Sequence, residues 1–187
     1  DTCDNAGTLK VRYKRPRRNT VKVLMLMDSG GSMSYYSQLC SMLFQAARQS
    51  NHFKELHVYY FHNCVYGRLY KDPMLFSKDS VTTDWVLSNI ATDWKVIFVG
   101  DAQMHPYELF EPFPVVKEGE PESGLDCLRR FKDRYRHIVW LNPYRRPRGG
   151  FFGEWGQTYD TISTLFNMYH LTVAGLEQAM KKLMVRE

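Results

Sequence analysis

The sequence of 187 residues lacks several features that would assign it to particular classes of protein. No apolar run approaches the ~20 residues that a transmembrane helix needs, so we expect no membrane partner. None of the four cysteines, Cys3, Cys40, Cys64 and Cys127, stands at the spacing of a CxxC pair. Scattered cysteines of this kind favour free thiols in a reducing compartment over a disulfide framework, and they predict a cytoplasmic location.

Positive charge is unevenly distributed along the chain, whose formal net charge is +5. Two runs, RYKRPRR at 12–18 and RRPR at 145–148, hold much of the excess and are candidates for binding a polyanion. Aromatic residues are not interleaved with these runs in the manner of a platform that stacks on bases, so we favour a solvated surface over nucleic-acid binding. The candidate polyanion-binding residues are Arg12, Lys14, Arg15, Arg17, Arg18, Arg145, Arg146 and Arg148.

Apolar runs alternate with helical periodicity, which predicts an α/β fold with a mostly parallel sheet and helices on both faces. We expect one domain over residues 21–187, preceded by an N-terminal arm or edge segment over 1–20. The predicted strands cover 21–27, 56–61, 65–70, 95–99 and 137–141, with the third forming an antiparallel edge strand. The predicted helices cover 36–47, 83–90, 125–135, 159–169 and 172–183. Residues 105–123 and 143–158 have the composition of loops.

The stretch VLMLMDSGGSM, residues 23–33, ends the first predicted strand in a carboxylate, Asp28, followed by Ser29, Gly30, Gly31 and Ser32. A phosphate-binding loop of the GxxxxGK[ST] type would need a lysine that is missing here. A trypsin-like protease, which DSGG resembles, would need a histidine-bearing segment upstream. An aspartyl-phosphate hydrolase would usually carry a second carboxylate two residues on, where the chain has Gly30. A metal site is the interpretation that we favour.

Polar residues also follow the other predicted strands. Because ligands bind outside the carboxyl ends of parallel strands, these residues should gather on one rim of the sheet. Carboxylates and hydroxyls are hard oxygen donors that suit Mg²⁺ or Mn²⁺ rather than zinc. The candidate ligands are Asp28, Ser32, Thr82 or Thr83, and Asp101, with Gly30, His62 and Asn63 as neighbours on the rim. For His62 and Cys64, which could share a soft metal, we favour a structural role.

These residues resemble the metal-ion-dependent adhesion site of von Willebrand factor A domains, whose motif is D-x-S-x-S, a threonine in a second loop and an aspartate after a later strand. Asp28 and Ser32 match the ends of the first motif, Gly30 replaces its middle serine, and Asp101 matches the third loop. The stretches YYFHNCVYGRLYKD, FVGDAQMHPYEL, VWLNP and MYHLTVAGLEQAM are similar to the bacterial von Willebrand A proteins called CoxE-like. The resemblance covers about residues 21–184.

The resemblance implies a protein-interaction module rather than an enzyme. The cation would be held by Asp28, Ser32 and a loop threonine, with Asp101 acting through water, and a partner's Asp or Glu carboxylate would complete its coordination. Loss of the serine at position 30 implies a weak metal site. Proteins of this group are commonly paired with MoxR-type AAA+ ATPases in protein maturation or remodelling, and a helical region often precedes the domain. A metal-dependent hydrolase or phosphatase using the same carboxylates stays open as an alternative.

Overall fold

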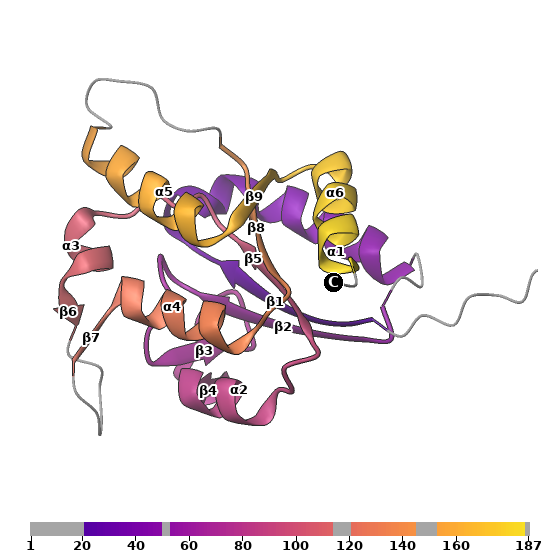
Figure 1. Cartoon of the computed structure of the whole chain (residues 1–187), viewed down its shortest axis with the longest axis horizontal. Coiled ribbons are helices and arrows are strands. Elements are labelled where there is room, and N and C mark those ends of the chain that lie inside the picture. Colours follow the sequence, from indigo (N-terminus) through magenta and orange to yellow (C-terminus); the bar gives the residue numbers. More distant parts are fainter. Residues whose placement is uncertain (1–20, 50–52, 114–120, 145–152, 186–187) are drawn as a thin grey trace, which may run out of the picture.

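The computed structural model describes residues 21–49, 53–113, 121–144 and 153–185 (Figure 1). The arm predicted over residues 1–20 and the basic run at 145–148 lie outside these ranges. No helix in the described ranges is long and apolar enough to cross a membrane.

A seven-stranded sheet in the order β4-β3-β2-β1-β5-β8-β9 forms the centre of the fold. Only β3 runs against its neighbours, and every other pairing among β1, β2, β5, β8 and β9 is parallel. This confirms the predicted mixed α/β fold, although the reversed strand lies next to a further edge strand, β4. The strands are β1 (Lys22–Asp28), β2 (Glu55–Phe61), β3 (Arg68–Tyr70), β4 (Ser80–Thr82), β5 (Lys95–Val99), β8 (Ile138–Asn142) and β9 (Asn167–His170).

Helices cover both faces of the sheet, which explains why its central strands are continuously apolar. On one face lie α1 (Ser37–Gln49) and α6 (Val173–Leu183), whose Leu43 and Ala179 join the core under β1 and β5 (Figure 1). On the other face lie α2 (Thr83–Asn89), α4 (Gly124–Arg134) and α5 (Gly153–Leu165). Val86, Phe131 and Ile162 belong to the core on that side.

Aromatic rings dominate the core between the sheet and α4 and α5. Phe98 of β5 stacks on Trp140 of β8, with ring centroids 5.0 Å apart and an interplanar angle of 9°. Phe131 and Phe166 approach the same Phe98 ring with centroid distances of 5.6 and 5.4 Å. Phe98 is therefore the common contact of four aromatic side chains, since Phe61 of β2 also meets it edge-on. Such ring pairs contribute beyond the apolar area that they bury.

The segment 105–123, predicted as a loop, contains a short helix and a small hairpin. The helix is α3 (Pro106–Phe110), and the hairpin pairs β6 (Pro112–Phe113) with β7 (Glu122–Ser123). A capping box begins α3, in which the side chain of His105 accepts from the amide of Tyr107 and Glu108 accepts from the amide of His105. The proline at the first helical position followed by Glu108 was the available sequence signal.

Two further boundaries differ from the sequence-based prediction. The predicted helix over 159–169 ends as α5 at Leu165, and Tyr169 lies instead in β9, paired with Leu141 of β8. The helix also begins earlier, at Gly153, inside a segment predicted as a loop. The first helix is preceded by a 3-10 segment, η2 (Gly31–Tyr36), and η3 (Ser77–Asp79) precedes β4. Period alone could not separate β9 from a last helical turn, because its pattern is too short.

Candidate functional site

The two predicted carboxylates lie on the same rim because they follow neighbouring parallel strands. Asp28 is the last residue of β1, and Asp101 comes two residues after the end of β5. Both are buried, with 8% and 2% of their surfaces exposed. Gly100 packs directly against the first carboxylate, since a Cβ added to it would lie 3.1 Å from the Cβ of Asp28.

Hydrogen bonds fix both carboxylates in place. The hydroxyl of Ser32, in η2, donates to Oδ2 of Asp101, and the amide of Gln103 donates to Oδ1 at 2.9 Å. The amide of Asn63, which follows β2, donates to Oδ1 of Asp28 at 3.0 Å. Three loops, after β1, β2 and β5, therefore meet at one place, as the sequence predicted for the strand ends.

The electrostatic environment of these acids favours their neutral forms. Burial raises the pKa of Asp28 to about 8, against the opposing effect of the Asn63 amide, and the negative charges of Asp101 and Glu108 raise it further. Burial also raises the pKa of Asp101, while the Ser32 hydroxyl and the Gln103 amide act in the opposite direction. Two desolvated carboxyls side by side need a proton or a cation to relieve their repulsion.

Asn63 connects the rim to a carboxylate behind it, a contact that sequence analysis missed. Its backbone is left-handed, with φ of 58°, and its side-chain amide donates to Oε1 of Glu108 at 2.8 Å. The backbone of the same residue binds Asp28, so one asparagine links both acids. The Tyr66 hydroxyl donates to the carbonyl of Glu108 at 2.7 Å and ties α3 to the loop after β2.

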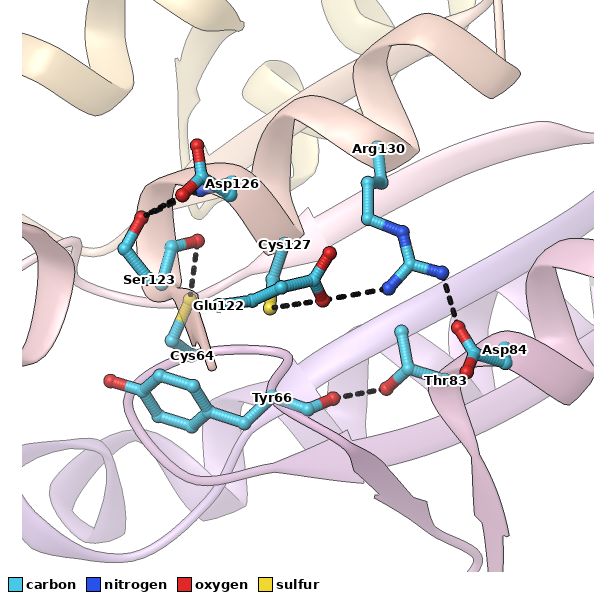
Figure 2. A network of polar contacts seen from close by, with 10 residues as sticks. Cys64, Tyr66, Thr83, Asp84, Glu122, Ser123, Asp126, Cys127 and Arg130 are labelled. Carbon is cyan, nitrogen blue, oxygen red and sulfur yellow. Dashed lines mark hydrogen bonds and ion pairs between the residues drawn. The ribbon is translucent and has the colours of Figure 1, made fainter. Parts of the chain in front are cut away.

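The candidate threonines lie at the start of α2, beyond the edge strand β4. Thr82 caps the helix, since its hydroxyl accepts from the amide of Trp85 at 3.0 Å. Thr83 is buried, and its hydroxyl donates to the carbonyl of Tyr66 (Figure 2). Neither hydroxyl forms a hydrogen bond with Asp28 or Asp101 in the described structure. The hydrogen bonds at the rim join Ser32 to Asp101 and Asn63 to Asp28, without a threonine.

A polar network fastens α2 to α4 (Figure 2). Arg130 of α4 pairs with Asp84 of α2 and, at 2.8 Å, with Glu122 of β7. The thiol of Cys64 donates to the carbonyl of Gly124 at 3.3 Å, in the first turn of α4. Cys64 is thus part of the packing, as predicted, and His62 bonds the backbone carbonyl of Ser29 through Nδ1 at 3.0 Å.

Gly30 occupies a conformation that side chains rarely adopt. Its φ is 87° and its ψ is −175°, a region that essentially only glycine populates. A Cβ at this position would also lie 3.4 Å from Nδ1 of His62. The sequence gives no sign of this restriction, and a serine here, as in the usual motif, would strain the loop.

We therefore expect Gly30→Ser to lower the free energy of unfolding by ~1–3 kcal/mol, the usual cost of a strained backbone. Urea unfolding followed by circular dichroism measures it. Gly156→Ser is the matched control, because Gly156 lies in α5 and no atom lies within 4 Å of an added Cβ. Equal stability of Gly30→Ser and the native chain would show that the loop after β1 adopts another conformation.

The available donors fit a hard divalent cation, although they are few in number. Asp28, Asp101 and Ser32 offer two carboxylates and a hydroxyl, which are ligands typical of Mg²⁺ or Mn²⁺. The described residues contain no group of three or more His, Cys, Asp or Glu side chains that could hold a metal. A cation at this rim would consequently depend on hydroxyl, backbone or water oxygens for its remaining ligands.

A groove of about 550 Å³ begins beside Asp28 and runs between η2, α1 and the segment that follows β3. Its walls are mainly apolar, and Asp28 is the one charged residue among the described residues that line it. Met74, in the segment after β3, is 71% exposed. The other principal lining residues are Met27, Met33, Tyr60 and Leu75.

Comparison with known proteins finds one family whose model matches part of the chain. The family model described as VWA domain containing CoxE-like protein matches residues 5–67. That stretch includes β1, α1, β2 and the rim residues Asp28, Ser32 and Asn63. The match and the fold support a von Willebrand factor A domain of the CoxE-like kind. No curated protein and no solved structure matches the chain.

Proposed function

We propose that this von Willebrand factor A domain is a protein-interaction module that binds its partner at the rim formed by the ends of β1 and β5. The observation that carries the proposal is the pair of buried carboxyls, Asp28 and Asp101, beside an exposed apolar groove. The match to the von Willebrand factor A family suggests a role in binding other proteins. An apolar groove next to a polar site, here lined by Met33, Met74 and Leu75 among others, is typical of a surface that binds another protein.

A divalent cation, Mg²⁺ or Mn²⁺, belongs to this proposal. Asp28, Asp101 and Ser32 would hold it, and the bound ion would offer a positively charged contact to a carboxylate of the partner. Two backbone amides orient the carboxylates: that of Asn63 donates to Asp28, and that of Gln103 donates to Asp101. Since Thr82 and Thr83 use their hydroxyls elsewhere and Gly30 has none, we expect weak affinity for the ion.

A MoxR-type AAA+ ATPase, or a target protein with an exposed Asp or Glu, is the partner that we propose, in a cytoplasmic setting. Apolar side chains next to that carboxylate would enter the groove between Met33 and Met74. A binding role is favoured over hydrolysis, because none of the motif positions that hold Asp28, Ser32 and Asp101 brings a histidine or lysine to serve as a base.

Metal titration of the native chain and Asp28→Ala tests the site. We expect Mg²⁺ or Mn²⁺ at about 100 times its Kd to raise the free energy of unfolding of the native chain by ~2.7 kcal/mol, and to leave Asp28→Ala unaffected. Asp79→Ala, which removes an exposed carboxylate in η3, should respond like the native chain. An identical response of all three chains would place the ion elsewhere.

Binding to a purified MoxR-type ATPase, measured by calorimetry with and without Mg²⁺, tests the partner. Met74→Glu should weaken binding by about tenfold or more if the groove takes part, because it places a charge on an apolar wall. Tyr107→Glu, an exposed aromatic on α3 that does not line the groove, is the control. An affinity that changes neither with Mg²⁺ nor with Met74→Glu would contradict the proposed surface.

A further inference from the structure

A second, positively charged pocket lies at the end of the sheet opposite the rim. It has a volume of about 210 Å³ and opens where β8 and β9 begin, between the last turns of α4 and α6. Because these strands run parallel to β1, their first residues, Ile138 and Asn167, lie at the far end from Asp28. The pocket is therefore separate from the proposed partner site.

The lining of this pocket is cationic. Lys132 and Arg136 come from the end of α4 and the turn after it, His137 follows, and Lys182 comes from α6. No acidic residue is among the described residues that line it. Within the described ranges, no hydrogen bond or ion pair holds the ammonium groups of Lys132 and Lys182.

We propose that this pocket binds a phosphate group, either of free inorganic phosphate or of a phosphate ester. Positive side chains from α4, the following turn and α6 repel one another, and a doubly charged oxyanion between them would relieve that repulsion. Each lysine offers a phosphate oxygen a point charge, and Arg136, which already has a contact of its own, adds positive charge to the lining. The volume is below the range usual for drug-sized ligands, so the pocket fits the phosphate group rather than a nucleoside attached to it.

An alternative explanation for these cations is the helix dipole, which favours Lys and Arg in the last turn of any helix. The chain offers a direct way to separate the two explanations. Lys181 and Lys182 both occupy the last turn of α6 and both are exposed. Only Lys182 lines the pocket. The helix dipole interacts equally with both lysines, whereas a phosphate in the pocket would contact Lys182 and not Lys181.

The experiment titrates the full chain with inorganic phosphate in the presence of EDTA at pH 7.5, followed by ¹H–¹⁵N NMR spectra. We expect saturable shifts at residues around 136–139, 167 and 182–185. Lys182→Ala and Lys132→Ala should each weaken phosphate binding about tenfold, as expected for loss of one charge-assisted contact. Lys181→Ala should bind like the native chain. Both lysines are exposed or half-buried, so the variants should fold, and their spectra report this directly.

Parallel titrations identify the anion. Sulfate should bind and acetate should not, since the pocket is expected to prefer a double negative charge. Equal binding of methyl phosphate and inorganic phosphate would indicate that esters are accepted, and binding of inorganic phosphate alone would indicate the free ion. The proposal is overturned if phosphate causes no saturable shifts at the pocket, if acetate binds equally well, or if Lys181→Ala and Lys182→Ala lose the same affinity.

Discussion

In metal-free buffer at pH 8, the Asp28→Asn chain is expected to be more stable than the native chain. The native carboxyl has its pKa raised from 3.8 to about 8, chiefly by burial. A difference of about four pH units corresponds to roughly 5 kcal/mol that ionisation of Asp28 costs the folded state at high pH. Asparagine avoids this cost, and its side-chain oxygen can still accept from the amide of Asn63.

The pH dependence has a definite sign. Between pH 4 and pH 8 the folded chain binds more protons at Asp28 than the unfolded chain does, so the free energy of unfolding of the native chain falls as pH rises. Above pH 8 both states are ionised and the effect of this group levels off. Asp28→Asn should therefore flatten most of the slope, leaving the smaller contribution of Asp101, which has the same sign.

Urea unfolding in EDTA at pH 5 and pH 8 measures both effects. Asp126→Asn is the control, because the hydroxyl of Ser123 lowers the pKa of Asp126 and its charge favours the folded state. Asp126 is ionised at both pH values, so this variant should be less stable than the native chain by a similar amount at pH 5 and pH 8, with the slope unchanged. A native chain whose stability does not change between pH 5 and pH 8 would mean that Asp28 is ionised in the folded state throughout.

Phe98→Ala is expected to cost ~3–5 kcal/mol of unfolding free energy, which is the range for removing a buried aromatic ring from a packed core. Phe98 is fully buried and contacts the rings of Trp140, Phe131, Phe166 and Phe61. Four aromatic neighbours cannot all move inward at once to fill the space that the missing ring leaves.

Thermal and urea unfolding compare Phe98→Ala with Phe98→Leu, which keeps much of the volume and should cost less. Phe76→Ala, which truncates an exposed phenylalanine, should change stability by no more than ~0.5 kcal/mol. If Phe98→Ala were as stable as Phe76→Ala, the ring cluster would not be a tightly packed part of the core.

The sequence predicted the central strands well because strands buried on both faces are apolar throughout, as in Val23–Met27. It also predicted that Asp28 and Asp101 would lie on one rim of the sheet, since both follow neighbouring parallel strands. The sequence-based prediction missed short strands such as β4 and β9, because three or four residues are too few to show a periodic pattern.

Contacts made by backbone and by remote side chains could not be predicted in the same way. The hydrogen bond from Asn63 to Glu108 joins residues 45 positions apart, and no local sequence pattern predicts it. The left-handed conformation of Asn63 and the φ of Gly30 arise from how the loops after β2 and β1 fit together. The bonds that engage Thr82 and Thr83 likewise depend on where β4 and α2 pack.

The two edges of the sheet have a consequence for how the protein behaves at high concentration. The outermost strands are β4, with three residues, and β9, with four, and polar residues make up much of both. An incoming strand from another molecule would find few backbone groups to pair with on β4 or β9. The outer edge of β2 is more open, because β2 pairs with β3 only through Tyr60. Strand-to-strand aggregation of the folded chain is thereby discouraged at β4 and β9, and the apolar strands β1, β5 and β8 are kept in the middle of the sheet.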